Sequence, residues 1–252
     1  MPDKPIDVAQ ANEHLRDSSP QEIIAWALVT FGDRLALQSS MQRTGCVLMH
    51  MIHADAPGIP VLFADTGVHF TETNDLRDLY AERYNLNIET LLPERDFEQQ
   101  YADFGRYLHE VDDSLDRTEP GYNHCCYLRK EVPFVAGVKG RFDAVIGGLM
   151  RAEGGRRGNT DIVSYDPRID AYKIYPLAYA TDEEVDRYVA SNKLPLHPLY
   201  AKGYASIGCL TCTTPVLPGE DRRAGRWRHI REKKPAGEQA PLYCGINLGE
   251  RK

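Results

Sequence analysis

The sequence of 252 residues contains no apolar run close to the roughly 20 residues that a membrane-spanning helix needs. Its first residues, MPDKPIDVAQANEH, contain no apolar core of the kind found in secretory signals. Internal repeats and low-complexity segments are also missing. We therefore expect a cytoplasmic protein that does not associate with a membrane.

Positive charge is in the minority, since 37 Asp and Glu outnumber 30 Lys and Arg and give a formal net charge of -7. This balance argues against a general nucleic-acid surface, although a local basic cluster could still bind phosphates. The length allows one sizeable α/β core and does not require two domains. We expect an α/β domain over residues 1–215 and an arginine-rich C-terminal segment with a mobile tail over 216–252.

The chain does contain six cysteines, most of them clustered. Cys125 and Cys126 are adjacent, Cys209 and Cys212 form a C-x-x-C pair, and Cys244 lies close to the C-terminus. In a reducing compartment, clustered cysteines favour metal binding or catalysis over structural disulfides. Four thiolates could hold zinc or an iron–sulfur cluster, or the four thiols could fill core space as small apolar side chains.

The two other cysteines differ in their surroundings. A fifth thiol at Cys244, in a terminal segment that can move, is better interpreted as a reactive group than as a ligand. Cys46 lies in an apolar helical run with Val47, Leu48 and Met51, which predicts a place in the core.

Strands and helices alternate along the chain, which predicts a mostly parallel sheet flanked by helices, with a site at the carboxyl ends of the strands. Residues 59–64 have the composition of a buried strand, and residues 71–84 behind them that of a helix. Residues 96–124 are polar and show no clear pattern. The other expected elements are helices over 20–31, 46–54, 126–139 and 182–192, and strands over 34–38, 88–92, 142–148, 161–165 and 172–175.

Three groups of residues could bind an anion at this edge of the sheet. Asp65, Thr66 and Gly67 follow a buried strand, where a nucleotide crevice or an ordinary turn would lie. An arginine loop from Arg151 to Gly158 follows another strand and is either an anion site or solvated surface. The same alternatives hold for the arginines that follow the C-x-x-C pair: Arg222, Arg223, Arg226 and Arg228.

In this order the motifs resemble the adenylyl-sulfate and phosphoadenylyl-sulfate reductases of assimilatory sulfate reduction, members of the adenine nucleotide alpha-hydrolase-like superfamily. The agreement is co-linear over most of the chain and is highly specific. The segments that carry it are LFADTG at 62–67, HCCYLRK at 124–130, IGGLMR at 146–151, GYASIGC at 203–209, RAGRW at 223–227 and CGI at 244–246.

The resemblance implies a cofactor, a substrate and a reductant. Family members with both cysteine pairs bind a 4Fe-4S cluster and usually reduce adenylyl sulfate, whereas members without them use the 3'-phosphorylated nucleotide, PAPS. It therefore implies a cluster on Cys125, Cys126, Cys209 and Cys212, with adenylyl sulfate favoured and PAPS, or both nucleotides, as alternatives. It also implies thioredoxin or a similar dithiol as reductant, and it leaves a homo-oligomer open.

Residue roles follow from the same resemblance. Cys244 would attack the sulfur of the sulfuryl group, AMP would leave, and a thiol would release sulfite from the resulting S-sulfocysteine. The implied substrate-binding residues are Ser40, Asp65, Thr66, Gly67, Lys130, Arg151, Arg223 and Arg226.

Some residues depart from the family pattern. Where the family has approximately S-F-G-A-E-D, this chain has SMQRTG at 40–45, Tyr243 replaces a glutamate, and the stretch between Trp227 and Cys244 is longer. His124 directly precedes the cysteine pair, and we assign it no catalytic role. Two other classes stay open: an ATP-dependent tRNA-thiolating enzyme, disfavoured because an S-G-G-x-D-S loop is missing and tRNA favours a more basic surface, and a non-enzymatic redox sensor that contains a metal.

Overall fold

The computed structural model describes residues 5–110, 124–233 and 246. In these parts of the chain no helix is long and apolar enough to cross a membrane. The helices are α1 (Val8–Leu15), α2 (Pro20–Phe31), α3 (Arg43–His53), α4 (Thr71–Tyr84), α5 (Phe97–Phe104), α6 (His124–Cys126), α7 (Val132–Val138), α8 (Asp182–Asn192) and α9 (Arg228–Arg231), and the strands are β1 (Leu35–Gln38), β2 (Val61–Ala64), β3 (Ile88–Leu91), β4 (Ala144–Ile146), β5 (Val163–Asp166) and β6 (Ala171–Ile174).

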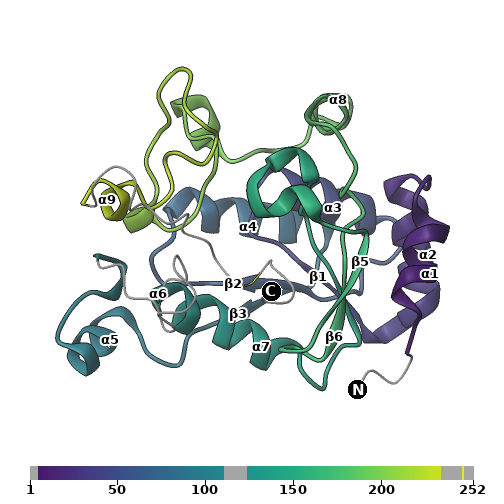
Figure 1. Ribbon diagram of the computed structural model, residues 1–252, viewed down its shortest axis with the longest axis horizontal. Helices are drawn as coiled ribbons and strands as arrows, with labels where there is room; N and C mark the ends of the chain where they lie inside the picture. The colour runs from purple at the N-terminus through teal and green to yellow at the C-terminus, as the bar shows by residue number, and fades with distance from the viewer. Residues whose placement is uncertain (1–4, 111–123, 234–245, 247–252) are drawn as a thin grey trace.

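The strands form one sheet in the order β3-β2-β1-β4-β6-β5 (Figure 1). Every neighbouring pair is parallel except β5 and β6, which are antiparallel. The chain moves outward from β1 to β2 and β3, and then returns to β4 on the other side of β1. The order reverses between β1 and β4, and such a reversal opens a crevice at the carboxyl ends of the strands. The expected mostly parallel α/β sheet is confirmed.

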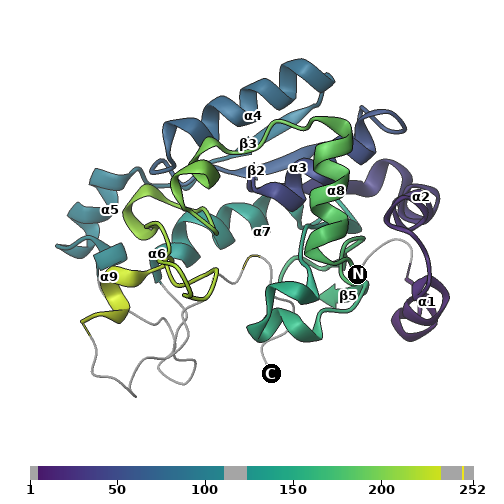
Figure 2. The ribbon, with the colours of Figure 1, turned by 90° about the horizontal axis from the view of Figure 1, so that it is seen from above.

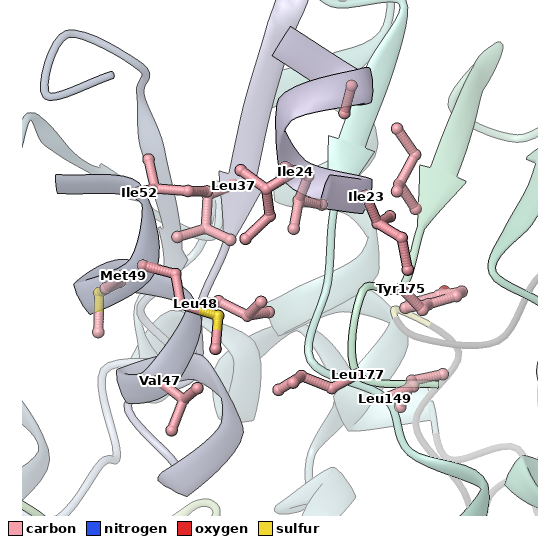
Figure 3. Packing of buried hydrophobic residues seen from close by; sticks show 14 of the residues in the cluster. Ile23, Ile24, Leu37, Val47, Leu48, Met49, Ile52, Leu149, Tyr175 and Leu177 are labelled. Carbon is pink, nitrogen blue, oxygen red and sulfur yellow. The ribbon is translucent and has the colours of Figure 1, made fainter. Parts of the chain in front are cut away.

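Helices cover both faces of the sheet, with α3 and α4 on one side and α7 on the other (Figures 1 and 2). Side chains alternate between the two faces along each strand. Leu37 of β1 therefore joins Ile23, Ile24 and Leu48 in the larger apolar cluster (Figure 3). The neighbouring Ala36 instead joins the smaller cluster, which α7 covers.

Three helices, α1, α5 and α9, were not expected from the sequence. In α1, the Asp7 side chain accepts hydrogen bonds from the amides of Ala9 and Gln10 and caps an otherwise polar segment. In α5, Asp96 and Gln99 form a reciprocal capping box within the stretch that showed no clear pattern. Both caps are visible in the sequence, but the short helices behind them have too few apolar positions for a clear periodic signal.

Two other helices differ in detail from expectation. Helix α3 begins at Arg43 rather than at Cys46, because its first amide is capped from a distance by the hydroxyl of Tyr200, at 3.1 Å. The helix expected over 126–139 changes its winding, since a π-helical turn at Tyr127–Glu131 separates α6 from α7. Pro133 lacks an amide hydrogen and crowds the preceding turn, which accounts for the wider winding just before it.

We expect Leu48→Ala to lower the free energy of unfolding by about 2–5 kcal/mol, because the variant leaves a cavity beside β1. Leu48 lies on α3, is fully buried, and belongs to the same apolar cluster as Leu37 of β1. Urea unfolding followed by circular dichroism measures the change. The matched control is Val29→Ala on α2, where the side chain is 85% exposed and the expected change is within about 0.5 kcal/mol. Equal losses in the two variants would contradict this description of the core.

Candidate active site

A cavity of about 70 Å³ lies at the carboxyl ends of β1 and β2, and we call it the edge pocket. Ser39 and Ser40 follow β1 into its wall, and Ala64 brings the end of β2. The other lining residues come from distant parts of the sequence and include many cations. They are Gln38, Gln42, His69, Thr73, Lys130, Arg157, Ile207, Gly208, Arg223, Arg226, Trp227 and Ile246.

The turn after β2 is closed by its own first residue. The Asp65 carboxylate accepts a hydrogen bond from the amide of Gly67 at 2.8 Å, which makes a local side-chain turn. Gly67 has a φ of +72°, a conformation that favours glycine. Thr66 between them is fully buried. Asp65 therefore shapes the turn, and Thr66 is the residue that points into the protein.

Thr66 joins this turn to two other segments. Its hydroxyl lies 3.3 Å from the sulfur of Cys209, and its carbonyl accepts a hydrogen bond of 2.7 Å from Nε of Arg129. Next to it, His69 and Cys209 form an isolated antiparallel bridge, and the amide of Leu210 donates to the carbonyl of Val68 at 2.9 Å. These contacts dock the C-x-x-C segment on the turn after β2.

The docking brings the four paired cysteines to one place. Cys125, Cys126, Cys209 and Cys212 are all buried, and all four line one small cavity, which we call the thiol cavity. Among the described residues, no three His, Cys, Asp or Glu side chains are grouped around the position of a single metal ion. The other residues that line the thiol cavity are Thr66, Val68, Arg129, Lys130, Thr211, Arg226 and Trp227.

The thiol cavity suits a group that carries compensating charge. Burial, and after it the neighbouring Cys209 and Cys212, raises the pKa of the Cys125 thiol to about 12, whereas Arg129 and Lys130 act to lower it. Burial also raises the pKa of Cys212. Bringing four thiolates together therefore needs more positive charge than these two side chains supply, and a bound metal or cluster would supply it.

Two buried donors at the wall of this cavity have no acceptor among the described residues. They are Nε of Arg226 and Nε1 of Trp227. Buried N–H groups are normally hydrogen-bonded, so a group with acceptor atoms fits there. An all-sulfur donor set beside unsatisfied N–H groups matches an iron–sulfur cluster, whose sulfides accept hydrogen bonds; the thiolates also suit zinc.

Three side chains line both cavities at once: Lys130, Arg226 and Trp227. The Arg226 guanidinium lies over the Trp227 ring at 4.8 Å, and a Cβ at Gly208 would overlap it, so only glycine leaves room for it there. Nearby, a guanidinium nitrogen of Arg223 donates to the hydroxyl of Ser206 at 3.4 Å. Positive charge thus separates the thiol cavity from the edge pocket.

The loop at 40–45 is held in place by the residues at which it departs from the family pattern. Gln42 accepts a hydrogen bond of 3.1 Å from the amide of Ile207, and Met41 is fully buried with a φ of +57°. Arg43 forms ion pairs with Asp182 and Asp186 of α8. Only Ser40 and Gln42 of this loop reach the edge pocket.

Two arginines of the loop after β4, Arg151 and Arg157, differ in whether they reach the edge pocket. Arg151 donates to the carbonyl of Thr160 at 2.6 Å, pairs with Asp161 at 3.0 Å and lies over the Tyr179 ring. It does not line the edge pocket, whereas Arg157 does, and Arg157 also pairs with Glu153. The structure therefore brings Ser40, Lys130, Arg223 and Arg226 to the edge pocket and Thr66 to the thiol cavity, and it leaves Asp65, Gly67 and Arg151 outside both linings.

His69 is a pocket residue that the sequence analysis did not identify. Its Nε2 lies 3.1 Å from the carbonyl of Ala64, and its ring is tilted against Phe63. Burial, together with the nearby Lys130 and Arg226, lowers the pKa of His69 to about 4. The sequence did offer one signal for His69: it lies two residues after the turn at the end of β2, where a site was expected.

Several expected residues cannot be placed. Cys244 and Tyr243 lie outside the described residues, as does most of the tail, and the side chain of Arg156 is not described. Cys46 is fully buried in the larger apolar cluster, as predicted.

We expect His69→Gln to reduce the loss of stability on mild acidification. Between pH 6.5 and 4 the unfolded chain binds a proton at His69 that the folded chain does not, so this histidine lowers stability as the pH falls. Glutamine keeps a donor for Ala64 but does not titrate. Urea unfolding should show that the variant loses about 1–2 kcal/mol less than the wild type between pH 7 and pH 5. Equal losses would contradict the lowered pKa.

Comparison with known proteins agrees with this arrangement. A model of the phosphoadenosine phosphosulfate reductase domain matches residues 34–215. The chain is 40% identical over 218 residues to the adenosine 5'-phosphosulfate reductase of Streptomyces coelicolor. The aligned region covers 86% of this chain and 87% of the relative. It is 37% identical over 226 residues to adenosine 5'-phosphosulfate reductase 1 of Bacillus subtilis, and this alignment covers 89% of both chains.

Solved structures share the fold. The phosphoadenylyl-sulfate reductase of Candida auris, in a phosphate complex, has a TM-score of 0.68 at 27% identity and covers 82% of this chain and 96% of its own. The FMN adenylyltransferase of Candida glabrata has a TM-score of 0.53 at 13% identity, covers 94% of this chain and 77% of its own, and is similar in fold alone.

Proposed function

The chain belongs to the phosphoadenosine phosphosulfate reductase domain family, and we propose that it reduces adenylyl sulfate to sulfite and AMP with a dithiol such as thioredoxin. Its fold is that of the adenine nucleotide alpha-hydrolase-like proteins. The observation that carries the proposal is the shared wall of Lys130 and Arg226, which lies between a pocket at the switch point and a cavity lined by four thiols. The relatives named as adenosine 5'-phosphosulfate reductases support the choice of substrate.

Cys244 is the proposed nucleophile. Its thiolate forms a bond to the sulfuryl sulfur, the sulfur–oxygen bond to the phosphate breaks, and the electron pair leaves with AMP. A thiolate of the reductant then attacks the Cys244 sulfur, sulfite departs with the electrons of the sulfur–sulfur bond, and the second thiol of the dithiol resolves the mixed disulfide. Thioredoxin and similar dithiols are kept reduced in the cytoplasm, where we place the reaction.

The location of Ile246 supports this role for Cys244. Ile246 lies in the wall of the edge pocket. Two residues of chain span at most about 7 Å, and this short reach supports the proposal that Cys244 acts at the edge pocket. The attacking thiolate and the sulfonucleotide are both anionic, and the cations of the pocket offset their repulsion.

The substrate-binding side chains act at two ends of the nucleotide. Lys130, Arg223 and Arg226 would hold the sulfate and stabilise the negative charge on the departing phosphate. Ser40 would contact the nucleotide from the end of β1. Asp65, Thr66 and Gly67 would shape the crevice, and Arg151 belongs to a loop proposed to close over the nucleotide.

We further propose that Cys125, Cys126, Cys209 and Cys212 hold a 4Fe-4S cluster. When bound, a cluster supplies charge and positioning next to Lys130, which borders both cavities. The two electrons of the reaction come from the dithiol, so this chain's part is to orient the sulfonucleotide and the thiol. PAPS, or both nucleotides, remains the alternative substrate, because the loop at 40–45 departs from the family pattern.

The decisive measurement is anaerobic sulfite release from adenylyl sulfate and from PAPS, with thioredoxin and with iron content determined on the same sample. Turnover with adenylyl sulfate alone supports the proposal in full. Turnover with PAPS alone overturns the choice of substrate. A fully loaded protein that turns over neither nucleotide would refute the reductase function.

Cys244→Ser should lower sulfite release by at least about 10³-fold, since the nucleophile is removed. The visible absorbance of the cluster should stay unchanged, because Cys244 is not one of the four proposed ligands. The matched control is Cys209→Ser, which should lose both absorbance and activity. A serine variant at 244 that retains turnover would exclude the S-sulfocysteine route.

Arg157→Ala should raise KM for the nucleotide by about tenfold, because it removes a charged donor from the edge pocket. Arg151→Ala, in the same loop, is the comparison variant: its side chain is held by Asp161 and Tyr179 outside the edge pocket, so it affects KM only if the loop closes over the nucleotide. Steady-state kinetics of both variants show which of the two arginines contributes to KM for the nucleotide. A larger effect at Arg151 would mean that the loop rearranges when the nucleotide binds.

A further inference from the structure

We propose that Lys173, at the centre of a buried ion network, docks the C-terminal segment through the main-chain carbonyl of Ile246 and so positions Cys244 for the reaction. The role of Cys244 rests on the proposed function, whereas the docking itself does not. Lys173 is a positioning residue in this proposal, since it acts through the tail.

Lys173 occupies an unusual place for a lysine. It lies within β6, between Ala171 and Ile174, and its side chain is 3% exposed. A cation buried this far from water needs acceptors from the protein. Its ammonium group donates to the carbonyl of Ile246 at 2.6 Å, lies 3.0 Å from the Asp166 carboxylate, and approaches the face of the Phe134 ring at 5.6 Å. The tail thus supplies one of the three contacts.

Among the described residues, the ion network around Lys173 contains equal numbers of cations and carboxylates. Arg168 binds Asp166 through two hydrogen bonds, of 2.9 and 2.6 Å, and it also binds Glu131 at 2.8 Å. Two cations therefore face two carboxylates: Lys173 and Arg168 against Asp166 and Glu131. Because Asp166 is shared between both cations, the carbonyl of Ile246 completes the acceptors around Lys173.

The same network reaches the substrate-binding cations. Glu131 directly follows Lys130 in the π-helical turn, so Arg168 holds the turn that carries Lys130. Ile246 and Lys130 both line the edge pocket. One set of ion pairs thereby fixes the tail and the sulfate-binding lysine relative to each other.

Ile246 also has an apolar anchor. Its side chain is 7% exposed and belongs to the cluster under α7, together with Phe134, Val138 and Val145. The hydrogen bond to its carbonyl fixes the main chain of Ile246, and the apolar contacts fix its side chain, so the position and orientation of this residue are both determined. This precision is what a nucleophile two residues away requires, since small displacements of a reacting group greatly reduce rates.

The test compares Lys173→Met and Ile246→Ala with the wild type, using the full chain with its iron–sulfur content matched. We expect the single-turnover rate of S-sulfocysteine formation, followed by intact mass, to fall by about 10- to 100-fold in both variants. Binding of AMP to Lys173→Met, whose altered residue lines neither cavity, should change by less than about threefold. Lys139→Met, an exposed lysine after α7, is the matched control and should match the wild type.

A second measurement reports docking without activity. In the wild type labelled at isoleucine and valine methyl groups, the Ile246 methyl should show contacts with those of Val138 and Val145 by nuclear Overhauser effects, and Lys173→Met should lose them. Ile246→Ala leaves the ion network intact and keeps the kinetic test valid if Lys173→Met does not fold.

The outcomes separate the two proposals. Unchanged single-turnover rates, or equal losses in rate and AMP affinity, would overturn a positioning role for Lys173. Methyl contacts that survive in Lys173→Met would overturn the docking. A wild type that shows the methyl contacts but turns over neither nucleotide would refute the proposed function and leave the docking in place.

Discussion

The buried side chain of Thr66 is the contact on which the rest of the site depends. It belongs to the turn after β2, its hydroxyl meets Cys209, and its carbonyl binds Arg129 beside the cysteine pair of α6. Three segments that are far apart in sequence therefore meet at one residue. Because Asp65 closes the turn locally, Thr66 is free to make these contacts, and the thiols from both pairs come to line a common cavity.

Much of this arrangement was predictable because it rests on local signals. Alternating strands and helices predicted the parallel sheet, and the family motifs predicted which cysteines would meet. The misses have two causes. Helices α1 and α5 are short and carry few apolar positions. Other features depend on contacts distant in sequence: Tyr200 caps the start of α3, and the hydrogen bond of Lys173 to Ile246 links β6 to the tail. A sequence pattern carries no information on such partners unless the family supplies it.

Charge decides the chemistry available to the two cavities. Burial, and after it the neighbouring thiols, raises the pKa of Cys125 and of Cys212 and so disfavours their thiolate forms in the absence of a bound cation. Lys130 and Arg226 reduce that cost from the wall shared with the edge pocket. The same two cations also line the edge pocket, so a change in charge on one side of the wall alters the electrostatic potential on the other side.

The altered loop at 40–45 shows how a departure from the family pattern can be accommodated. Arg43 pairs with Asp182, and Asp182 also binds Arg222, the residue before Arg223. One carboxylate thus connects this loop to the segment that brings Arg223 and Arg226 to the edge pocket. Gln42 binds the amide of Ile207 and also reaches the edge pocket, whereas Arg43 pairs with Asp182. The four cations that line the edge pocket, Lys130, Arg157, Arg223 and Arg226, come from other segments of the chain. The departure from the family pattern therefore changes the residues that hold this loop in place, and it leaves the positive charge of the edge pocket unchanged.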